Sequence, residues 1–232
     1  MRILKALVLC PLLLPFEVFG QQSYVGRYDV GNAFTWLNSP SVHLQERGYH
    51  LQVGVNPRRW LALGFDYSVV FGKVVLRADE LKPELQAAIG SQLAKLAAAG
   101  LLPPGYQVAV GADSKTQTFA AGPQLEYRRF ERATLFVRPA IGAIYEVANP
   151  QASDPITKGI VAQLAPGGSK TEWKPFYGFG GGADVNFGGH FSVRLQADFV
   201  HNALFTDILN SSRNTVRLSI GPALHFGRNV LQ

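Results

Sequence analysis

The sequence predicts an all-β protein: a closed eight-stranded antiparallel up-and-down transmembrane β-barrel with one helical insertion in an extracellular loop. Three observations predict it. Eight segments alternate between apolar and polar residues with a period of two, which indicates strands whose two faces meet different surroundings. The connections between these segments differ in length in the way typical of barrels that cross a bilayer. Only 16% of the 232 residues are charged, whereas about a quarter is usual in soluble domains.

The clearest strand runs from Trp60 to Phe71, after a tight corner at residues 56–58. One face of this strand holds only large apolar side chains, and the other mixes Asp66 with glycine and small residues. At about 3.3 Å per residue, a tilted strand of this length crosses a bilayer. A soluble barrel would turn the apolar face inward, whereas a membrane barrel turns it toward lipid. We predict the second arrangement.

Eight strands are expected in all, and their connections separate into two classes. The connections near residues 57, 130 and 189 are short, and those near 42, 95, 160 and 209 are longer. Tight periplasmic turns and larger extracellular loops give a transmembrane barrel this asymmetry. A soluble lipocalin-like barrel also has eight strands, but nothing requires its loops to separate by length. The predicted strands span residues 24–37, 48–56, 60–71, 116–127, 133–147, 172–187, 190–205 and 215–226.

The first 20 residues are predicted to be a cleaved signal peptide, which leaves residues 21–232 as the barrel. Arg2 and Lys5 precede a short apolar run, and small residues precede Gln21. The alternative is a buried N-terminal helix. Cys10 is the one cysteine and leaves with the signal, so the mature chain is expected to have no disulfide and no thiol chemistry.

Residues 72–115 interrupt the strand pattern and are predicted to form a long extracellular loop with a helix at about 79–100. Asp79 is the expected N-cap and Gly100 the expected stop. Residues 148–171, rich in Gly, Pro, Ser and Asp, form a second irregular stretch. The apolar stripe of the helix recurs at helical spacing and comprises Leu81, Leu85, Ile89, Leu93 and Leu96. We expect this stripe to pack against the barrel mouth or neighbouring loops; the alternative is a binding or membrane-interface helix.

The polar faces of the strands are predicted to meet in the lumen as a charged network. Charges of both signs in a narrow interior must pair, because desolvating either alone costs several kcal/mol. The short turns place Asp184 opposite Arg194 and His50 near Asp66, and we expect a plugged interior. The predicted network comprises Arg27, Asp29, His50, Asp66, Glu126, Arg138, Glu146, Lys174, Asp184, Arg194, Asp198 and Arg217.

Aromatic residues fall at both ends of the predicted strands, with aliphatic residues between them. This distribution indicates two belts at the membrane interfaces, although aromatic residues also favour strands in general. Four prolines (123, 139, 175 and 222) lie within strands, and we expect bulges or lost pairing there. The belt next to the longer loops comprises Tyr49, Tyr145, Trp173 and Phe205, and the belt next to the tight turns comprises Tyr127, Phe187, Phe191 and Phe226.

Four short motifs, together with the strand layout, carry a family resemblance over residues 24–227. They are Phe119-Ala120-Ala121-Gly122-Pro123-Gln124, Gly180-Gly181-Gly182-Ala183-Asp184, Leu195-Gln196-Ala197-Asp198-Phe199 and Leu224-His225-Phe226-Gly227. With them the chain resembles the small outer-membrane β-barrels of the porin family related to the transmembrane domain of outer membrane protein A. Relatives often add a peptidoglycan-binding module, but this chain ends at Gln232, so tethering to the wall is not expected. Because residues follow Phe226, the insertion signal is expected to be internal.

The resemblance implies a non-enzymatic protein of the Gram-negative outer membrane, with an envelope-structural or surface-interaction role. We expect contact with outer-membrane lipid and lipopolysaccharide, and with an extracellular partner through loops 72–115 and 148–171. We expect a monomer without cofactor or metal. The basic residues are spread along the chain, which argues against nucleic acid as a partner.

Three other functions stay open: a narrow ion or small-solute channel, a lipid A-modifying enzyme and a soluble periplasmic lipocalin-like carrier. For the enzyme, the nearest candidate is His201, but the lipid A deacylases that it would resemble have a serine where this chain has Ala203.

Overall fold

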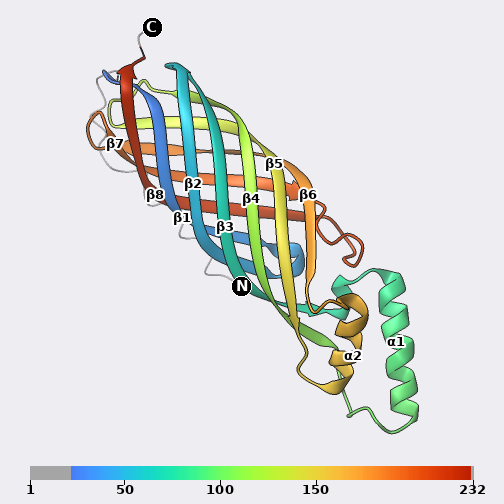
Figure 1. Ribbon diagram of the computed structural model, residues 1–232. Coiled ribbons are helices and arrows are strands. Elements are labelled where there is room, and N and C mark those ends of the chain that lie inside the picture. The colour runs from blue at the N-terminus through green and yellow to red at the C-terminus, as the bar shows by residue number, and fades with distance from the viewer. Residues whose placement is uncertain (1–21, 231–232) are drawn as a thin grey trace, which may run out of the picture.

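The computed structural model describes residues 22–230; the predicted signal peptide at 1–20 lies outside the described residues. Figure 1 shows the strands wound obliquely around one axis, with both helices beyond one end. Among the described residues, neither helix is long and apolar enough to cross a membrane. The strands are β1 (Gly26–Ser39), β2 (Leu44–Arg58), β3 (Leu61–Arg77), β4 (Ala109–Tyr127), β5 (Ala133–Gln151), β6 (Lys170–Asn186), β7 (Phe191–Asn202) and β8 (Arg213–Asn229), and the helices are η1 (Pro40–Val42), η2 (Ala78–Glu80), α1 (Pro83–Ala98) and α2 (Pro155–Leu164).

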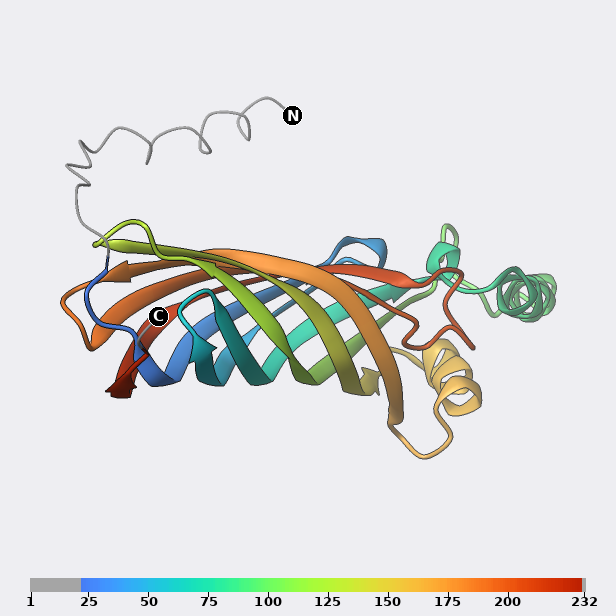
Figure 2. The same cartoon turned by 90° about the horizontal axis from the view of Figure 1, so that it is seen from above.

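The eight strands form a closed antiparallel barrel, which confirms the predicted fold class. Each strand pairs with its neighbours in the sequence, and β8 pairs with β1. We call the end with the β2–β3, β4–β5 and β6–β7 connections the turn end. The opposite end, with the β1–β2, β3–β4, β5–β6 and β7–β8 connections, is the loop end. Figure 2 shows α1 and α2 projecting from the loop end, beyond the strands.

The strands are staggered, so a row of directly paired residues descends around the wall. From Thr171, near the loop end of β6, the row passes through β5, β4, β3, β2, β1, β8 and β7. It returns to β6 at Gly181, ten residues closer to the turn end than Thr171. Closing a barrel requires such a stagger together with a strand tilt of about 35–45°. Neighbours within one row therefore lie at different heights along the barrel.

The first connection is short, contrary to the prediction. β2 begins at Leu44, so only η1 and His43 separate it from β1. His43 adopts a left-handed conformation, with a φ of 51°, that closes the turn. The sequence predicts a break at residues 39–47, which contain Pro40. In the structure alternate residues of this stretch point inward from Leu44 onward, and Glu46 is buried.

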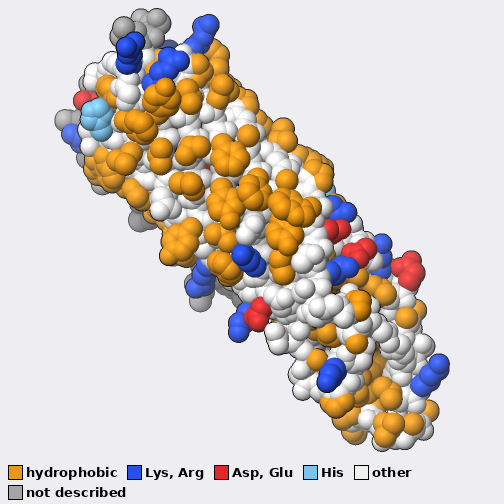
Figure 3. All heavy atoms as spheres, in the orientation of Figure 1, with side chains coloured by type: hydrophobic (Ala, Val, Ile, Leu, Met, Phe, Trp, Pro, Cys, Tyr) orange, Lys and Arg blue, Asp and Glu red, His pale blue; other side chains and the backbone are white. Residues whose placement is uncertain are grey.

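The outer wall is apolar and the interior is polar. Leu63, Ile141 and Leu195 expose 53%, 57% and 44% of their surfaces, whereas Asp66 and Arg194 expose 2% and 6%. In Figure 3, apolar side chains cover most of the visible barrel wall. Because alternate residues of a strand point to opposite faces, the polarity along each strand is the reverse of that in a soluble barrel. It agrees with the transmembrane arrangement predicted from the alternation.

The prolines interrupt pairing, as expected, or lie where none is needed. The β4–β5 ladder breaks where Pro123 faces Pro139, and the β1–β8 ladder breaks around Pro222. Pro175 lies where β6 extends past the end of β7. A proline has no N–H to donate to a ladder, so each of these positions tolerates its loss.

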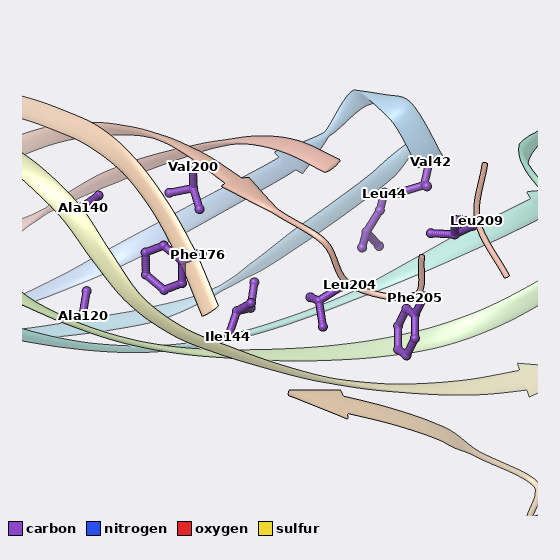
Figure 4. Packing of buried hydrophobic residues seen from close by; sticks show 10 residues of the cluster. All are labelled: Val42, Leu44, Ala120, Ala140, Ile144, Phe176, Val200, Leu204, Phe205 and Leu209. Atoms are coloured by element: carbon purple, nitrogen blue, oxygen red, sulfur yellow. The ribbon is translucent and has the colours of Figure 1, made fainter. Parts of the chain in front are cut away.

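A cluster of apolar residues lies inside the barrel near the loop end, and we call it the mouth cluster. Leu204 and Phe205 enter it from the β7–β8 connection and pack beside Ile144 and Leu44, as Figure 4 shows. Its buried members are Val42, Leu44, Ala120, Ala140, Ile144, Phe176, Val200, Leu204, Phe205 and Leu209. The sequence did not predict this apolar layer, because alternation alone assigns the apolar residues to the outside.

The two helices pack on each other rather than standing alone. α1 lies within the predicted range, but it begins at Pro83 with Lys82 at the N-cap, so Asp79 belongs to η2 instead. Gly100, with a φ of 71°, follows its last turn. The stripe of α1 faces α2 in the neighbouring loop, which agrees with the expected packing against neighbouring loops; that this part of the loop is helical was not predicted. The buried contacts between them and the adjoining strand are Leu81, Ile89, Val108, Val110 and Ile160.

Candidate functional site: the sealed lumen and the loop-end helices

The lumen at the turn end is closed by a chain of hydrogen bonds centred on Asp29. Its carboxylate contacts His225 Nδ1 at 2.5 Å and accepts from Asn56 Nδ2 at 2.8 Å. The other ring nitrogen of His225 lies 2.8 Å from Ser192 Oγ. All four side chains are buried. The contacts link β1, β2, β7 and β8, so they stabilise the barrel around the β1–β8 pairing that closes the ring.

Asp184 and Arg194 form the ion pair predicted from the short turn near residue 189, where Gly188 and Gly189 follow each other. Arg194 Nε donates to Asp184 Oδ1 and Nη2 donates to Oδ2, both at 2.6 Å. The guanidinium also donates to Gln52 Oε1 across the lumen at 2.6 Å, and it lies 4.9 Å from the centre of the Phe136 ring. A buried pair is stable only when its remaining hydrogen-bonding groups are also satisfied. Here Gln52 and Phe136 supply those further contacts.

Two arginines cross the middle of the lumen. Arg217 Nε and Nη2 donate to Asp198 Oδ2 at 2.9 and 2.7 Å. Arg138 contacts Asp66 and also donates to Asp198 Oδ1 at 3.3 Å. His50 Nε2 lies 3.2 Å from Asp66 Oδ1, as the Pro57 corner predicts. Five charged or titratable groups from β2, β3, β5, β7 and β8 therefore meet in one layer.

A second cluster of polar side chains, built around two glutamates, fills the half of the lumen nearer the loops. The sequence analysis did not predict most of its members. Ser114 Oγ lies 2.8 Å from Glu46 Oε1 and 3.3 Å from Glu146 Oε1, so one hydroxyl bridges the two carboxylates. Thr116 donates to Glu46 at 3.0 Å. Arg213 Nη2 donates to Glu146 Oε2 at 2.6 Å. Only Glu146 of these residues belonged to the predicted network.

Glu126 is buried at the turn end, where its partner is Arg128 on the same strand end. Gln124 Nε2 also donates to Glu126, at 2.8 Å. Arg128 reaches Gln22 Oε1 at 3.1 Å. Gln22, close behind the predicted signal peptide, therefore contributes to the inside of the barrel.

Two predicted members of the network do not lie in it. Arg27 is exposed, because the register between β1 and β8 shifts between Gly26 and Tyr28 and the alternation breaks there. Lys174 keeps the inward parity, but it lies at the mouth, is half-buried and pairs with Glu172 at 2.9 Å. The other ten predicted residues are buried within the barrel.

Six of the eight predicted belt residues are exposed on the outer wall. Tyr145 is half-buried because it stacks on Trp173, with ring centres 4.7 Å apart. The prediction that Phe205 belongs to the outer belt is wrong, because its side chain exposes 4% of its surface and packs in the mouth cluster. Its φ of 54° turns the chain inward at the start of the β7–β8 connection. The exposed residues are Tyr49, Trp173, Tyr127, Phe187, Phe191 and Phe226.

A groove of about 770 Å³ runs between α1 and α2 on the loop-end surface. Asp154 fixes the start of α2, because its Oδ1 accepts from Ile156 N at 2.8 Å and Thr157 N at 2.9 Å. Tyr106 also donates to this carboxylate, at 2.9 Å. The bonds from Thr157 and Tyr106 lower the pKa of Asp154 to about 2. The residues lining the groove include Leu93, Leu96, Leu101, Tyr106, Ile156 and Ile160.

The histidine considered for lipid chemistry has no nucleophile beside it. His201 Nδ1 lies 2.8 Å from Asn214 Oδ1, and its ring lies against Tyr177 on the outer wall. General-base activation of a serine requires the two side chains to lie within about 2.6–3.2 Å of each other. Among the described residues, the contacts of His201 include no serine and no carboxylate.

Comparison with known proteins identifies the fold. No protein-family model matches the sequence, and no curated protein matches it. Among solved structures, the chain is similar to Neisserial surface protein A (NspA), with a TM-score of 0.53 and 9% identity, covering 86% of this chain and 96% of that one. It is also similar to the outer membrane protein OprG from Pseudomonas aeruginosa, with a TM-score of 0.54 and 10% identity, covering 90% and 99%.

Identities this low relate the folds and carry no activity from one protein to the other. They agree with what the chain shows by itself, which is a ring of eight antiparallel strands with an apolar wall around charged side chains. The chain therefore has the fold of the small eight-stranded outer-membrane β-barrels, the OmpA-like group that its sequence resembles.

Proposed function

We propose that the protein is a non-enzymatic integral protein of the Gram-negative outer membrane, sealed along its axis, that acts through its loop-end helices. The observation that carries this proposal is the reversed polarity of the barrel. Large apolar side chains cover the wall, while Asp66, Asp184 and Asp198 are buried inside. Exposing such a wall to water would be unfavourable, whereas acyl chains solvate it.

The height of the apolar wall fits a bilayer. On β2, Arg47 and Arg58 are exposed at the two margins. At about 3.3 Å per residue and a tilt of about 40°, the stretch between them spans about 28 Å, close to the hydrocarbon thickness of a membrane. The outward side chains between the two arginines are Tyr49, Leu51, Val53, Val55 and Pro57.

Two features support a sealed axis. Arg138 contacts carboxylates on β3 and β7. Arg217 on β8 reaches across the lumen to Thr118 on β4, with an Nη1–Oγ1 distance of 3.1 Å. Above them, Leu204 and Phe205 fill the mouth. An eight-stranded barrel is just wide enough for side chains to fill. Since these side chains occupy the lumen, the contacts favour a sealed barrel over a channel.

The loop-end helices are the contact surface that we propose. They project beyond the wall and carry the groove between α1 and α2. Function on a rigid barrel usually resides in such loops. Contact with an outside partner and stabilisation of the envelope are the two roles that this surface fits.

The insertion is tested by cell fractionation and by gel migration with and without heating. We expect the protein in the outer-membrane fraction, with a folded form that migrates differently from the heated form. Protease added to whole cells should cut within residues 78–108 and leave the strands intact. Recovery in the soluble periplasmic fraction would overturn the proposal.

The role of α1 and of its groove with α2 is tested by a variant in which a two-residue turn replaces residues 78–108. Arg77 and Ala109 are directly paired, so a tight turn joins them without disturbing the ladder. We expect the barrel to fold and insert normally. In a strain lacking the protein, wild type should restore resistance to detergent and large antibiotics. If the variant restores it fully, α1 does not serve the envelope and a surface partner remains as its role. If wild type restores nothing, the envelope role is wrong.

A further inference from the structure

A groove on the outer wall, separate from the loop-end helices, crosses β6, β7, β8 and β1. Its volume is about 600 Å³, within the range typical of small-ligand sites. Gly181, Ala183 and Ala197 line it and add almost no side chain to the wall. The larger side chains that line it are Phe34, Trp36, Leu195, Leu218 and Ile220.

Trp36 brings an unused hydrogen-bond donor to this groove. Its Nε1 is buried and has no acceptor among the described residues. A buried N–H without an acceptor is unfavourable, and tryptophan N–H groups usually find a partner when buried. If the indole turned its N–H toward the groove that it lines, an occupant that carries a carbonyl oxygen could accept from it.

Arg47 lies beside Trp36 on the loop-end side. The two residues are directly paired across β1 and β2, and the stagger places Arg47 one step higher in the row. It is exposed, and it has no acidic partner within the described part of the chain. The row continues upward through Phe71 to Lys115, whose Nζ lies 5.7 Å from the centre of the Phe71 ring. Two cations therefore lie above the groove, at the margin of the apolar wall.

In the other direction the row descends from Trp36 into the groove. It passes Leu218 and Ala197 and reaches Gly181, closer to the turn end. From the loop end downward the wall thus holds two cations, the Trp36 indole with its unused N–H, and an apolar trough. A membrane lipid has the same order of groups: a phosphate, an ester or amide carbonyl, and an acyl chain.

We propose that this wall binds one phosphorylated acyl lipid of the outer leaflet, with the phosphate at Arg47, a chain carbonyl at Trp36 and the acyl chain in the groove. This proposal rests on the proposed insertion into the outer membrane. Cationic side chains at the membrane surface attract anionic headgroups. A charge-assisted bond to phosphate is about twice as strong as a neutral one, so Arg47 should decide which headgroup is held.

The test uses the full-length mature barrel, folded in detergent and mixed with lipid A or with enzymatically dephosphorylated lipid A. Native mass spectrometry counts the lipids retained per barrel. We expect one lipid A on the wild type. Arg47→Gln should weaken retention of lipid A about tenfold and leave the dephosphorylated form nearly unchanged. Arg58→Gln, at the other end of the same strand, is the matched control and should behave as wild type.

Two further variants test the donor and the trough. Trp36→Phe keeps an aromatic side chain, although a smaller one, and removes the N–H. It should weaken retention of both lipids about fivefold. Trp173→Phe makes the same change elsewhere on the wall and is its control. Ala197→Leu fills the trough and should abolish retention, whereas Ala121→Leu, on the opposite wall, should not. Both leucines face lipid, so both variants should fold.

Equal retention by Ala197→Leu and Ala121→Leu would overturn the proposal. So would a wild-type barrel that binds no lipid A while migrating as a folded, heat-modifiable band. That second result leaves insertion intact, whereas failure to fractionate with membranes would remove the proposed function itself. A change in dimer content on Ala197→Leu, without a change in lipid, would assign the groove to a second copy of the chain instead.

Discussion

Arg194 forms a bidentate ion pair with Asp184, in which Nε and Nη2 each lie 2.6 Å from a different carboxylate oxygen. Asp184→Ala leaves the guanidinium buried without its main partner. Breaking a buried pair in this way costs about 3–5 kcal/mol. We expect a loss of that size in the free energy of unfolding, measured by urea titration of the barrel in lipid vesicles.

The matched control for this pair is the exposed one between Lys170 and Asp207, whose Nζ–Oδ2 distance is 2.5 Å. Exposed pairs contribute about 0–1 kcal/mol. Asp207→Ala should therefore change the stability little. Equal losses in the two variants would mean that solvent reaches Asp184 and that the lumen is wet.

Any side chain at position 142 is expected to destabilise the barrel, because β4 passes close to Gly142. A Cβ there would lie 1.9 Å from the carbonyl oxygen of Phe119 on the neighbouring strand. Gly142→Ala should therefore shift the backbone and lower the stability by about 1–3 kcal/mol. Gly111→Ala, in the same pair of strands, meets nothing within 4 Å and should be neutral. The same urea titration compares the two variants, and equal stabilities would contradict the close approach of β4 and β5.

The mouth cluster is not the only barrier along the axis. Replacing Leu204 and Phe205 by serine should loosen the β7–β8 connection. Beneath it, Arg138 still reaches Asp66 and Arg217 still reaches Thr118 across the lumen. We therefore expect no stepwise current in planar bilayers from either wild type or this double variant. Reproducible channels in wild type that change with Arg138→Ala would establish the channel function instead.

The start of α2 should weaken in acid. The folded protein holds the pKa of Asp154 at about 2, below its ordinary value near 3.8. A lowered carboxyl pKa stabilises the fold above the unfolded pKa, and that stability is lost as the pH falls through the folded pKa. Between pH 4 and pH 2, α2 should therefore lose its N-cap.

Limited proteolysis checks this prediction. Pepsin at pH 2 should cut residues 151–170 faster than an acid-stable strand turn such as 186–191. At pH 7, Asp154→Ala should show the same sensitivity to a neutral protease, and Ser153→Ala should not. Resistance of α2 in Asp154→Ala would show that the packing of Ile160 alone holds the helix.

The period-two alternation predicted most of this structure because one physical contrast, lipid outside and paired charge inside, acts along every strand. That contrast placed Asp66 and Arg138 inside and Leu63 outside correctly. The alternation predicted too little at the strand ends, where the contrast between lipid and interior stops. Glu46 and Arg213 lie in strand ends outside the predicted strands, although extending the alternation by a few residues would have included both.

Other features depend on contacts between distant residues, which no local pattern carries. Phe205 turns inward because the β7–β8 connection folds into the mouth, and Arg27 turns outward because β8 bulges beside it. α2 is a different case. Asp154 followed by Pro155 is an ordinary helix start, and that signal was overlooked within a stretch rich in Gly and Ser.

The join between β1 and β8 has a consequence for how the protein can be shortened. The backbones of β1 and β8 are hydrogen-bonded to each other. Removing either strand therefore opens the ring and leaves an unpaired edge on each of its two neighbours. In hydrocarbon each unpaired N–H or C=O costs several kcal/mol, and no water is there to replace the lost partner. Terminal truncation that reaches either strand should therefore yield no smaller barrel, only a chain that fails to assemble.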